Sequence, residues 1–528
     1  MAAARLVLAV DLGTSGCKCA LATLEGAVLD WAYRPVTLYV EGVAAEQEPE
    51  DWWRALVGAA GELLARAPSA RDVVVAVCCS TQGEGTVCVD RDGKAIGRAL
   101  TWLDMRGEKA IGERAGGRFR VAGYGPLALW RWLRLTGGAP ALSGKDSAGH
   151  IAYLKKREPE RYGRAYKLLN VLDYLNLRLS GRFVATRDSI LTAWVTDNRH
   201  GETRYDRRLI AQLGVDADKL PEIVASTDVL GPLTAEAAQA LGLARDVVVV
   251  AGAIDNSAVA VGAGAVADYD THLYLGTSSW LGAHVSFKKT DLVSKIAAVP
   301  GAITGRYLAT ALQSAAGANL SFFRDRILYH PDELLGDEQR PDVYQALDRI
   351  AASVPAGARG LLYTPWLFGE RTPVDDPSLR AGLVNLSLEH SRADIVRAFL
   401  EGVALNSRWM LEPFERFLGR AGQSLTAVGG CAQSDLWCQI LADATGRAIR
   451  QPEAPIQANA AGAALIAAVG IGALSFDDVP KLMRWRRVYE PQSEARALYD
   501  ERFATFKEVH RRLAPLYRRL NPPREVAR

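Results

Sequence analysis

Apolar and polar positions follow the same order of short runs and helical stripes in both halves of the chain. Runs of alternating or continuous apolar residues predict strands, and apolar residues at helical spacing predict helices. In the first half we expect strands at 6–11, 17–24, 28–36 and 73–79, a helix at 49–65, a hairpin at 86–90 and 95–100, a helical region at 151–180 and an apolar run at 247–250. The residues 106–148, rich in Gly and basic side chains, predict irregular structure.

The second half repeats this order of strands and helices. We expect strands at 271–275, 280–285 and 308–313, helices at 393–414, 436–445 and 458–468, and an amphipathic surface helix at 499–517. A chain of 528 residues is too long for a single hydrophobic core. The pattern therefore predicts an α/β protein of two related domains, 1–250 and 251–528, that close on a substrate between them.

Composition and charge exclude several classes of protein. Apolar residues make up 49% and charged residues 23%, as in a globular chain, and the net charge of +3 gives no reason to expect nucleic acid or an anionic membrane as a partner. No apolar run is long enough to span a bilayer, and the first residues become acidic too soon for a signal peptide. The seven cysteines show no zinc spacing and no disulfide framework, so we expect a reducing cytoplasm.

The segment Leu-Gly-Thr-Ser occurs twice, at 12–15 and at 275–278. Each copy follows a short apolar run and leads into another. Glycine lets the backbone come close to a ligand, and the amide groups and the threonine hydroxyl can face phosphate oxygens. Two such turns half a chain apart predict a duplicated domain that holds a nucleotide from both sides.

Asp11 ends the first predicted strand, directly before the first of these turns. A carboxylate beside phosphates is repelled unless a cation lies between them, and Mg²⁺ takes oxygen ligands. Asp11 is therefore a candidate metal ligand, with capping of the turn as the alternative. Lys18 can add positive charge near the phosphates, or it can be a solvated residue of the second strand.

Two further segments are candidates for chemistry. Asp255 follows an apolar run and precedes another, at the end of a predicted strand and the start of a helix. Such a carboxylate can be a helix N-cap, a general base that takes a proton from a substrate hydroxyl, or both. The turn at 429–432 follows an apolar run, and its two glycines would let a flat adenine ring lie on the backbone. An ordinary strand-to-helix turn is the alternative.

Taken together, these segments resemble the FGGY family of carbohydrate kinases, and most of all its xylulokinase branch. The resemblance runs over nearly the whole chain, and its motifs stand in the family's order. They are Val10 to Ser15, Gly252 to Asn256, Leu275 to Ser278, Thr364-Pro365 with Gly369 to Pro373, Leu386 to His390, and Gly429 to Ser434.

The resemblance implies two domains of ribonuclease-H-like fold, as in the actin and hexokinase ATPases, with ATP and Mg²⁺ in a central cleft. Asp255 would be the base that activates a sugar hydroxyl, and Asp11 would hold Mg²⁺ directly or through water. The residues that the resemblance assigns to the nucleotide are Gly13, Thr14, Lys18, Gly276, Thr277, Gly317, Gly430, Cys431 and Ser434. Positioning and electrostatic stabilisation then supply most of the catalysis.

The sugar side departs from the family pattern. The resemblance assigns Gln82, Gly83, Glu84, Asp104 and Asp255 to the substrate. Xylulokinases carry Gln-Met-His where this chain has Gln-Gly-Glu, and the glutamate is similar to that of glycerol kinases. A lysine that is usual in the family is replaced by His150.

These observations lead to one main expectation and two alternatives. The main one is an ATP-dependent kinase that converts D-xylulose to D-xylulose 5-phosphate. The first alternative is a kinase of the same family for ribulose, erythritol or glycerol. The second comes from another class, an actin-like or chaperone-like ATPase or a nucleotide-dependent binding protein. The expected partners are a sugar or polyol and ATP, and the resemblance favours a homodimer.

Overall fold

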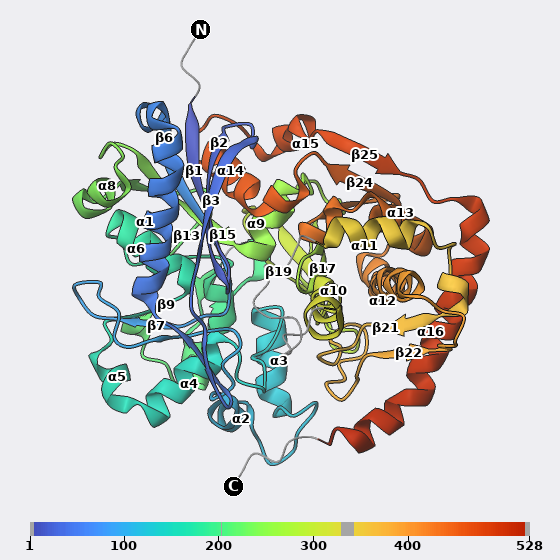
Figure 1. Ribbon diagram of the computed structural model, residues 1–528. Helices are drawn as coiled ribbons and strands as arrows, with labels where there is room; N and C mark the ends of the chain where they lie inside the picture. Colours follow the sequence, from blue (N-terminus) through green and yellow to red (C-terminus); the bar gives the residue numbers. More distant parts are fainter. Residues whose placement is uncertain (1–4, 202, 329–342, 523–528) are drawn as a thin grey trace, which may run out of the picture.

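Two large β-sheets that share an order of six strands form the two halves of the molecule (Figure 1). The structure is a computed structural model that describes residues 5–201, 203–328 and 343–522. The first sheet has the order β14-β15-β6-β1-β2-β3, and the second has the order β18-β19-β20-β17-β16-β23-β24-β25. The shared part of each sheet has three antiparallel strands (β3, β2 and β1, or β20, β17 and β16), then two strands added in parallel and a last antiparallel strand. In the second sheet β18 and β19 extend the antiparallel side. This shared order confirms the repeat inferred from the sequence.

The first sheet places the first Gly-Thr turn and the end of β15 at one edge. Its strands are β1 (Leu6–Leu12), β2 (Gly16–Thr23), β3 (Val28–Pro35), β6 (Val74–Thr81), β14 (Val229–Pro232) and β15 (Val248–Ile254). β6 is parallel to both β1 and β15, so these three strands end on the same side of the sheet. Helices of this half are α1 (Pro49–Arg66), α2 (Glu108–Ala115), α3 (Pro126–Leu135), α4 (Ser147–Arg157), α5 (Pro159–Arg164), α6 (Val171–Ser180), α7 (Arg207–Leu213) and α8 (Ala235–Leu241).

The second sheet places the second Gly-Thr turn and the 429–432 turn at its own edge. Its strands are β16 (Thr271–Leu275), β17 (Ser279–Val285), β18 (Lys289–Asp291), β19 (Ile296–Pro300), β20 (Tyr307–Gln313), β23 (Ser424–Val428), β24 (Ala448–Pro452) and β25 (Trp485–Tyr489). Helices of this half are α9 (Asp255–Gly262), α10 (Gly317–Phe323), α11 (Tyr344–Ala352), α12 (Arg392–Leu418), α13 (Asp435–Thr445), α14 (Ala458–Gly470), α15 (Val479–Leu482) and α16 (Ser493–Leu520). α12 and α13 cover a continuous apolar core on one face of this sheet.

Short strands form small sheets around the two large ones. They are β4 (Tyr39–Glu41), β5 (Ala44–Gln47) and β8 (Ala99–Leu100), then β7 (Val87–Val89) with β9 (Lys167–Leu169), β10 (Val184–Thr186) with β13 (Glu222–Val224), β11 (Thr196–Asp197) with β12 (Arg204–Tyr205), and β21 (Leu362–Thr364) with β22 (Gly382–Val384). Among these short strands, β5 contributes a residue, Gln47, to the candidate active site described below.

Helices α9 and α14 join the two halves. α14 belongs to the second half of the sequence, yet it packs on β1, β2 and β6 of the first sheet and shares an apolar cluster with them. A Cβ on Gly262 would lie 1.8 Å from the Ala458 carbonyl oxygen, and one on Gly462 would lie 1.9 Å from the Ala258 carbonyl oxygen. Glycine at both positions therefore lets the two helices touch backbone to backbone.

Three features differ from the sequence expectations. Residues 106–148 contain α2 and α3, because Ala110, Ile111, Trp132 and Leu135 pack into one buried cluster that the glycines around them concealed. The helical region expected at 151–180 is interrupted by β9. The boundary expected at 250 falls inside β15, which completes the first sheet.

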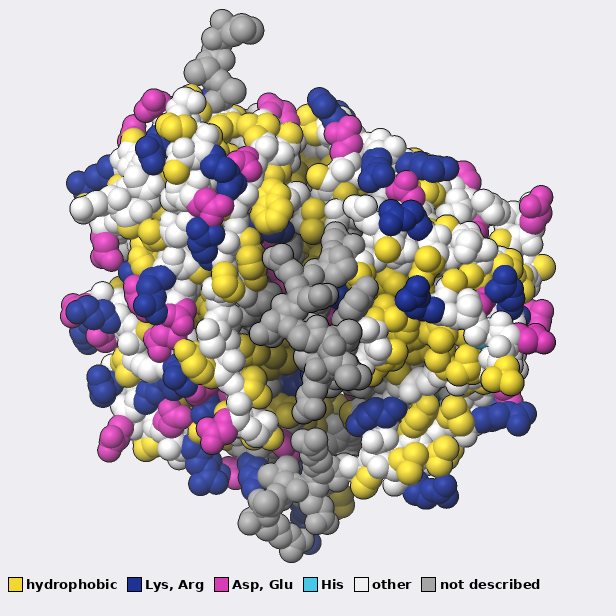
Figure 2. Space-filling model, viewed as in Figure 1, with side chains coloured by type: hydrophobic (Ala, Val, Ile, Leu, Met, Phe, Trp, Pro, Cys, Tyr) yellow, Lys and Arg dark blue, Asp and Glu magenta, His cyan; other side chains and the backbone are white. Residues whose placement is uncertain are grey.

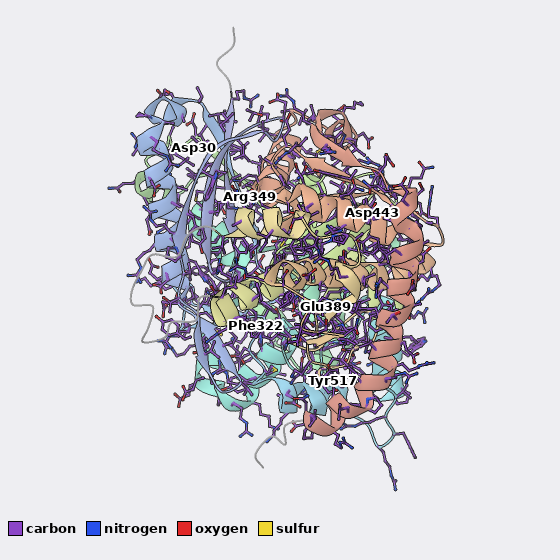
Figure 3. The ribbon with its side chains drawn as sticks, turned by 45° about the vertical axis from the view of Figure 1, so that its right-hand side comes forward. Asp30, Phe322, Arg349, Glu389, Asp443 and Tyr517 are labelled. Carbon is purple, nitrogen blue, oxygen red and sulfur yellow. The ribbon has the colours of Figure 1, made fainter. Side chains whose placement is uncertain are left out.

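The surface carries no single-sign region on the face that Figure 2 draws, where Lys and Arg are interspersed with Asp and Glu. α16 runs along the outer edge of the second half. Asp443 accepts a hydrogen bond from the Gln492 amide just before this helix, and Tyr517 lies near its other end (Figure 3). Within the described residues, no helix is both long and apolar enough to cross a membrane.

Candidate active site

Asp255 lies where β15 ends and α9 begins, at the junction of the two halves. The strand bends before it, because Gly252 has φ of 73° and a Cβ there would lie 2.1 Å from the Cys79 carbonyl oxygen. The carboxylate of Asp188, which is buried, accepts a hydrogen bond of 3.0 Å from the Ile254 amide. Glycine and Asp188 together fix the direction in which the Asp255 side chain leaves the backbone.

The Asp255 carboxyl is set up to exchange a proton near neutral pH. Burial raises its pKa to about 7, and the charges of Asp11, Glu84 and Asp188 add to the rise. The Asn256 amide opposes it by donating a hydrogen bond of 2.7 Å to Oδ1. The residue keeps some exposed surface. A partly accessible carboxyl with this pKa has the properties of a general base.

Asp11 lies close enough to Asp255 for its charge to raise the pKa of the Asp255 carboxyl. Burial raises the pKa of Asp11, whereas Lys18 and a hydrogen bond from Asn459 lower it. The Lys18 ammonium is 3.9 Å from Oδ2, and its side chain is only 16% exposed, so it is not the solvated strand residue of the alternative interpretation.

These residues fit the donor set that Mg²⁺ takes beside phosphates. Among the described residues there is no group of three or more His, Cys, Asp or Glu that could hold a metal. Mg²⁺ in phosphoryl-transfer sites uses one or two carboxylates and completes its shell with phosphate oxygens and water. Asp11 supplies such a carboxylate, and the Asn459 amide oxygen next to it is buried with no hydrogen-bond partner in the described part of the chain.

The first Gly-Thr turn is tied to the predicted sugar side. The Gly13 amide donates to the Gly16 carbonyl, which closes the turn. The Thr14 hydroxyl donates to Gln82 Oε1 at 2.9 Å and accepts from the Trp102 indole at 2.8 Å. The Thr14 hydroxyl is therefore already engaged on the sugar side, and its contact with a phosphate stays a prediction.

Gln47 extends this network. Its side-chain amide donates to the Thr14 carbonyl at 2.7 Å, and its oxygen accepts from Gln82 Nε2 at 2.7 Å. The Trp52 indole donates to the same oxygen at 3.1 Å. Because Gln47 is fully buried, the network fixes the rotamer of Gln82.

The second Gly-Thr turn contacts two other predicted nucleotide residues. The Gly317 amide donates to the Gly276 carbonyl at 2.8 Å, and the Cys431 thiol lies 3.8 Å from the same oxygen. A Cβ on Gly317 would be 2.7 Å from both the Cys431 sulfur and the Gly276 oxygen. The Thr277 carbonyl accepts from the Ala316 and Ala318 amides. The Thr277 hydroxyl makes no hydrogen bond among the described residues, unlike that of Thr14.

The 429–434 turn has the open glycine that an adenine ring needs. A Cβ on Gly430 would meet nothing within 4 Å, so a ring can approach its backbone. Burial raises the pKa of Cys431 to about 12, so its thiol is neutral at physiological pH and does not repel a nucleotide. The Ser434 hydroxyl caps α13 by accepting from the Trp437 amide at 3.0 Å.

A single loop joins this turn to the first half. The Gly429 amide donates to the Pro455 carbonyl at 2.8 Å, and Lys18 of the first half donates to the Ile456 carbonyl at 3.4 Å. Asn459, at the start of α14, reaches Asp11. The loop therefore brings the 429–434 turn and the first Gly-Thr turn close together. That the two turns hold one nucleotide stays a prediction.

The charge of Glu84 acts on Asp255, and two cations, Arg371 and Lys145, act on Glu84. Glu84 has φ of 64°, a conformation that costs free energy in a non-glycine residue. Burial raises its pKa, and the charges of Arg371 and Lys145 lower it. Arg371 comes from the second half, so this cluster spans both halves. Gly83 packs against the Ile254 side chain. A Cβ on Gly83 would lie 3.4 Å from the Ile254 Cδ1, so a larger side chain would not fit there.

The buried Glu370 holds the backbone that carries Arg371. Its Oε1 accepts from the Ser314 and Arg371 amides at 2.9 and 2.8 Å, and its Oε2 accepts from Asn406 Nδ2 at 2.6 Å. The family stretch at 369–373 therefore has a physical role in directing Arg371 toward the first half.

Asp104 has a different environment from the one expected. It is fully buried, and its oxygens accept from the Ala45 amide and from the backbone and guanidinium of Arg106. It offers no exposed oxygen to a sugar hydroxyl, and its contacts are those of a structural carboxylate. His150 is also fully buried, with Nδ1 3.1 Å from the Thr86 hydroxyl, and burial lowers its pKa to about 4.

Comparison with known families agrees with this geometry. The N-terminal domain of the FGGY family of carbohydrate kinases matches residues 6–115 and 135–262, and the C-terminal domain of that family matches residues 272–471. The chain belongs to the FGGY family. It is therefore an ATP-dependent carbohydrate kinase with the two-domain, actin-like ATPase fold.

Relatives of this FGGY kinase cover it almost end to end. The xylulose kinase of Staphylococcus epidermidis is 27% identical over 97% of each chain. The autoinducer-2 kinase of an Enterobacter strain is 28% identical over 96% of this chain and 94% of its own. The crystal structure of the xylulose kinase from Rhodospirillum rubrum superimposes with a TM-score of 0.80 at 27% identity, covering 97% of this chain and 100% of the other.

Several residues of the candidate site escaped the sequence analysis. They are Gln47, Lys145, Asp188, Arg371 and Asn459. Arg371 stands in a motif that was recognised, and Lys145 stands in a Ser-Gly-Lys segment that resembles a phosphate loop but lacks its pattern. No sequence signal marks Gln47 or Asp188, because their roles depend on contacts with segments far away in the chain.

Proposed function

We propose that this kinase transfers the γ-phosphoryl group of ATP to a hydroxyl of a small sugar, with D-xylulose as the first candidate and Asp255 as the general base. The observation that carries the proposal is the environment of Asp255, a partly exposed carboxyl with a pKa of about 7 that burial and the nearby charges of Asp11 and Glu84 raise. Its position at the junction of the halves supports a role between nucleotide and sugar.

Each chain residue has a distinct task in this proposal. Asp255 takes the proton of the attacking hydroxyl, so that the oxygen becomes a better nucleophile as the bond to phosphorus forms. The Gly13 and Gly276 turns and Lys18 bind and orient the phosphates, and Asp11 with Asn459 would hold Mg²⁺. When bound, Mg²⁺ supplies positive charge that offsets the charge on the transferred group. Most of the rate enhancement comes from holding the attacking oxygen, the γ-phosphorus and the leaving oxygen in line and from stabilising their charge.

Gln82 and Glu84 are the proposed sugar contacts. Gln82 is held by Gln47 and Thr14, so its remaining hydrogen-bonding capacity points in a fixed direction. A site built from such groups rejects an acceptor that lacks a matching hydroxyl, because the polar groups of the protein are then left unpaired.

A second candidate acceptor is a polyol such as erythritol or glycerol, or the ketose ribulose. The feature in its favour is Glu84 preceded by Gly83, which differs from the Gln-Met-His of xylulokinases. The cytoplasmic location and the homodimer remain predictions.

The test is a panel of acceptors in a coupled assay of ADP release with Mg-ATP. The panel contains D-xylulose, D-ribulose, erythritol, glycerol and the acceptor of the autoinducer-2 kinases. We expect the highest kcat/KM with D-xylulose. A higher value with erythritol or glycerol would transfer the assignment to the polyols. ADP release that no acceptor stimulates would favour a sugar-independent ATPase and overturn the proposal.

A further inference from the structure

A polar cavity lies in the second half, away from the nucleotide turns. Its volume is about 110 Å³. The polar and aromatic side chains that line it include Asp270, Thr271, Ser424, Thr426, Arg450 and Trp485. It lies between the end of α9, the first residues of β16 and β23, and the segment that joins α15 to β25; α15, β24 and β25 lie at the top right of Figure 1.

The alternation of side chains along β23 explains why this cavity is polar. Leu425 and Ala427 face the apolar core under α12 and α13. Ser424 and Thr426 therefore point to the opposite face. Arg450 pairs with Thr426 in the neighbouring strand β24, so it lies on that face too. The face of the sheet that lines the cavity therefore carries hydroxyl groups and a guanidinium, and its apolar side chains lie on the opposite face.

Opposite charges face each other in the cavity without pairing. The Asp270 carboxylate makes no hydrogen bond and no ion pair with any described residue. Burial raises its pKa, and the charge of Arg450 lowers it. The Arg450 guanidinium donates to the Ser424 hydroxyl and lies 5.6 Å from the centre of the Trp485 ring. One carboxylate and one guanidinium leave the cavity with no net charge, which favours a neutral ligand with several hydroxyls.

We propose that this cavity is an effector site for a small neutral polyol of about four carbons, a size that matches the space of roughly four water molecules. Hydroxyl groups of the ligand donate to Asp270 and accept from Arg450, and its carbon–hydrogen face packs on Trp485. The site is separate from the one proposed for phosphoryl transfer.

Three elements connect the cavity to the active site. Gly264, which lines the cavity, follows α9, and α9 begins at Asp255. Thr271 begins β16, which ends just before Gly276, and Ser424 begins β23, which ends just before Gly429. Five residues of strand span roughly 16 Å. A ligand that fixes these ends restrains the catalytic carboxylate and both nucleotide turns, and this coupling rests on the proposed function.

Methionine methyl groups give a direct readout of binding, because the chain has only four methionines. Met483 lines the cavity, whereas Met410 is fully buried in the core of the second half. In protein labelled with ¹³C at the methionine methyls, we expect titration with erythritol to shift the Met483 resonance to saturation and to leave Met410 in place. Met483→Leu identifies the resonance.

Variants decide whether the shift comes from the cavity. We expect Asp270→Asn and Thr426→Val each to weaken the Met483 response about tenfold or more, and the exposed Asp246→Asn to leave it unchanged. A Met483 resonance that erythritol does not move, or a response that survives both cavity variants, overturns the site. This readout needs no turnover, so it stands or falls independently of the kinase assignment.

The coupling has its own measurement. With the best acceptor of the panel, we expect saturating erythritol to change the KM for ATP by about fivefold or more in the wild type and not in Asp270→Asn. If erythritol proves to be the best acceptor, it is present in every assay and cannot be added separately as an effector. In that case we compare the KM for ATP of the wild type with that of Asp270→Asn, both at saturating erythritol. Equal KM values in the two proteins would refute the coupling.

Discussion

The hydroxyl of Thr14 donates a hydrogen bond of 2.9 Å to the side-chain oxygen of Gln82. The first residue belongs to the turn predicted to hold phosphate, and the second is a proposed sugar contact. The related Thr277 in the second half has a hydroxyl with no partner among the described residues. The duplicated turns are therefore not equivalent: the Thr14 hydroxyl is bound to the proposed sugar contact Gln82, whereas the Thr277 hydroxyl is free to bind a ligand.

Replacing Thr14 with valine should affect the sugar more than ATP. The change leaves the Gln82 side-chain oxygen and the Trp102 indole N–H without the Thr14 hydroxyl as a partner. An unpaired buried polar group costs about 1–3 kcal/mol. We expect KM for the acceptor to rise about tenfold, with a smaller effect on KM for ATP. The matched variant Thr277→Val should show the reverse order. Equal effects of both variants on both constants would contradict the distinction.

The Asp255→Asn variant should keep ATP binding and lose turnover. The amide preserves the size of the side chain but cannot take a proton from a hydroxyl, and general base catalysis contributes ~10²–10⁴-fold. We expect the acceptor-dependent rate to fall by that factor, and the affinity for ATP, measured by calorimetry, to stay within about threefold. An unchanged acceptor-dependent rate would refute the assignment.

The pH dependence of kcat/KM should report the Asp255 carboxyl. The base works only when it is deprotonated, and its pKa is about 7. We therefore expect kcat/KM to increase about tenfold per pH unit below that value and to level off above it. The residual activity of Asp255→Asn should lack this limb. A wild-type profile that is flat between pH 5 and about 8 would argue against Asp255 as the base.

The same carboxyl should make the folded protein less stable at high pH. Its folded pKa of about 7 is above the ordinary value of 3.8, so the folded state binds the proton more tightly than the unfolded state. Its contribution to stability is present at low pH and is lost as the pH rises through about 7. We expect Asp255→Asn to melt a few degrees higher than the wild type at pH 8 and at nearly the same temperature near pH 4. A lower Tm for the variant at pH 8 would contradict this account of the charge cluster.

Two glycines of the nucleotide side should respond differently to alanine. A Cβ on Gly317 would be 2.7 Å from the Gly276 carbonyl oxygen, so Gly317→Ala should lower Tm and raise KM for ATP. Gly430 has open space around it, so Gly430→Ala should raise KM for ATP with no change in Tm. A Gly430→Ala enzyme with wild-type KM for ATP would show that adenosine does not lie on this turn.

Most helices and strands could be predicted from local sequence patterns. The predictions failed where packing between distant segments determines the structure. The strands at 6–12 and 271–275 and the helix at 49–66 were recognisable because their apolar periodicity is strong. α2 and α3 were missed because the glycines around them favour turns, while the burial of Ile111 and Trp132 against other helices stabilises them. Asp104 was assigned to the sugar from its place in a motif, but Arg106 and the Ala45 amide bind its carboxylate.

By itself, the sequence determined the duplicated order of strands and helices, the two Gly-Thr turns and the candidate base, since these depend on residues that are neighbours in the chain. Only the tertiary structure decided that α14 returns to the first sheet, that Asn459 reaches Asp11 and that Arg371 lies beside Glu84. The reason is physical: such contacts form when distant segments bury apolar surface together, and no local pattern encodes which polar side chains that burial brings together.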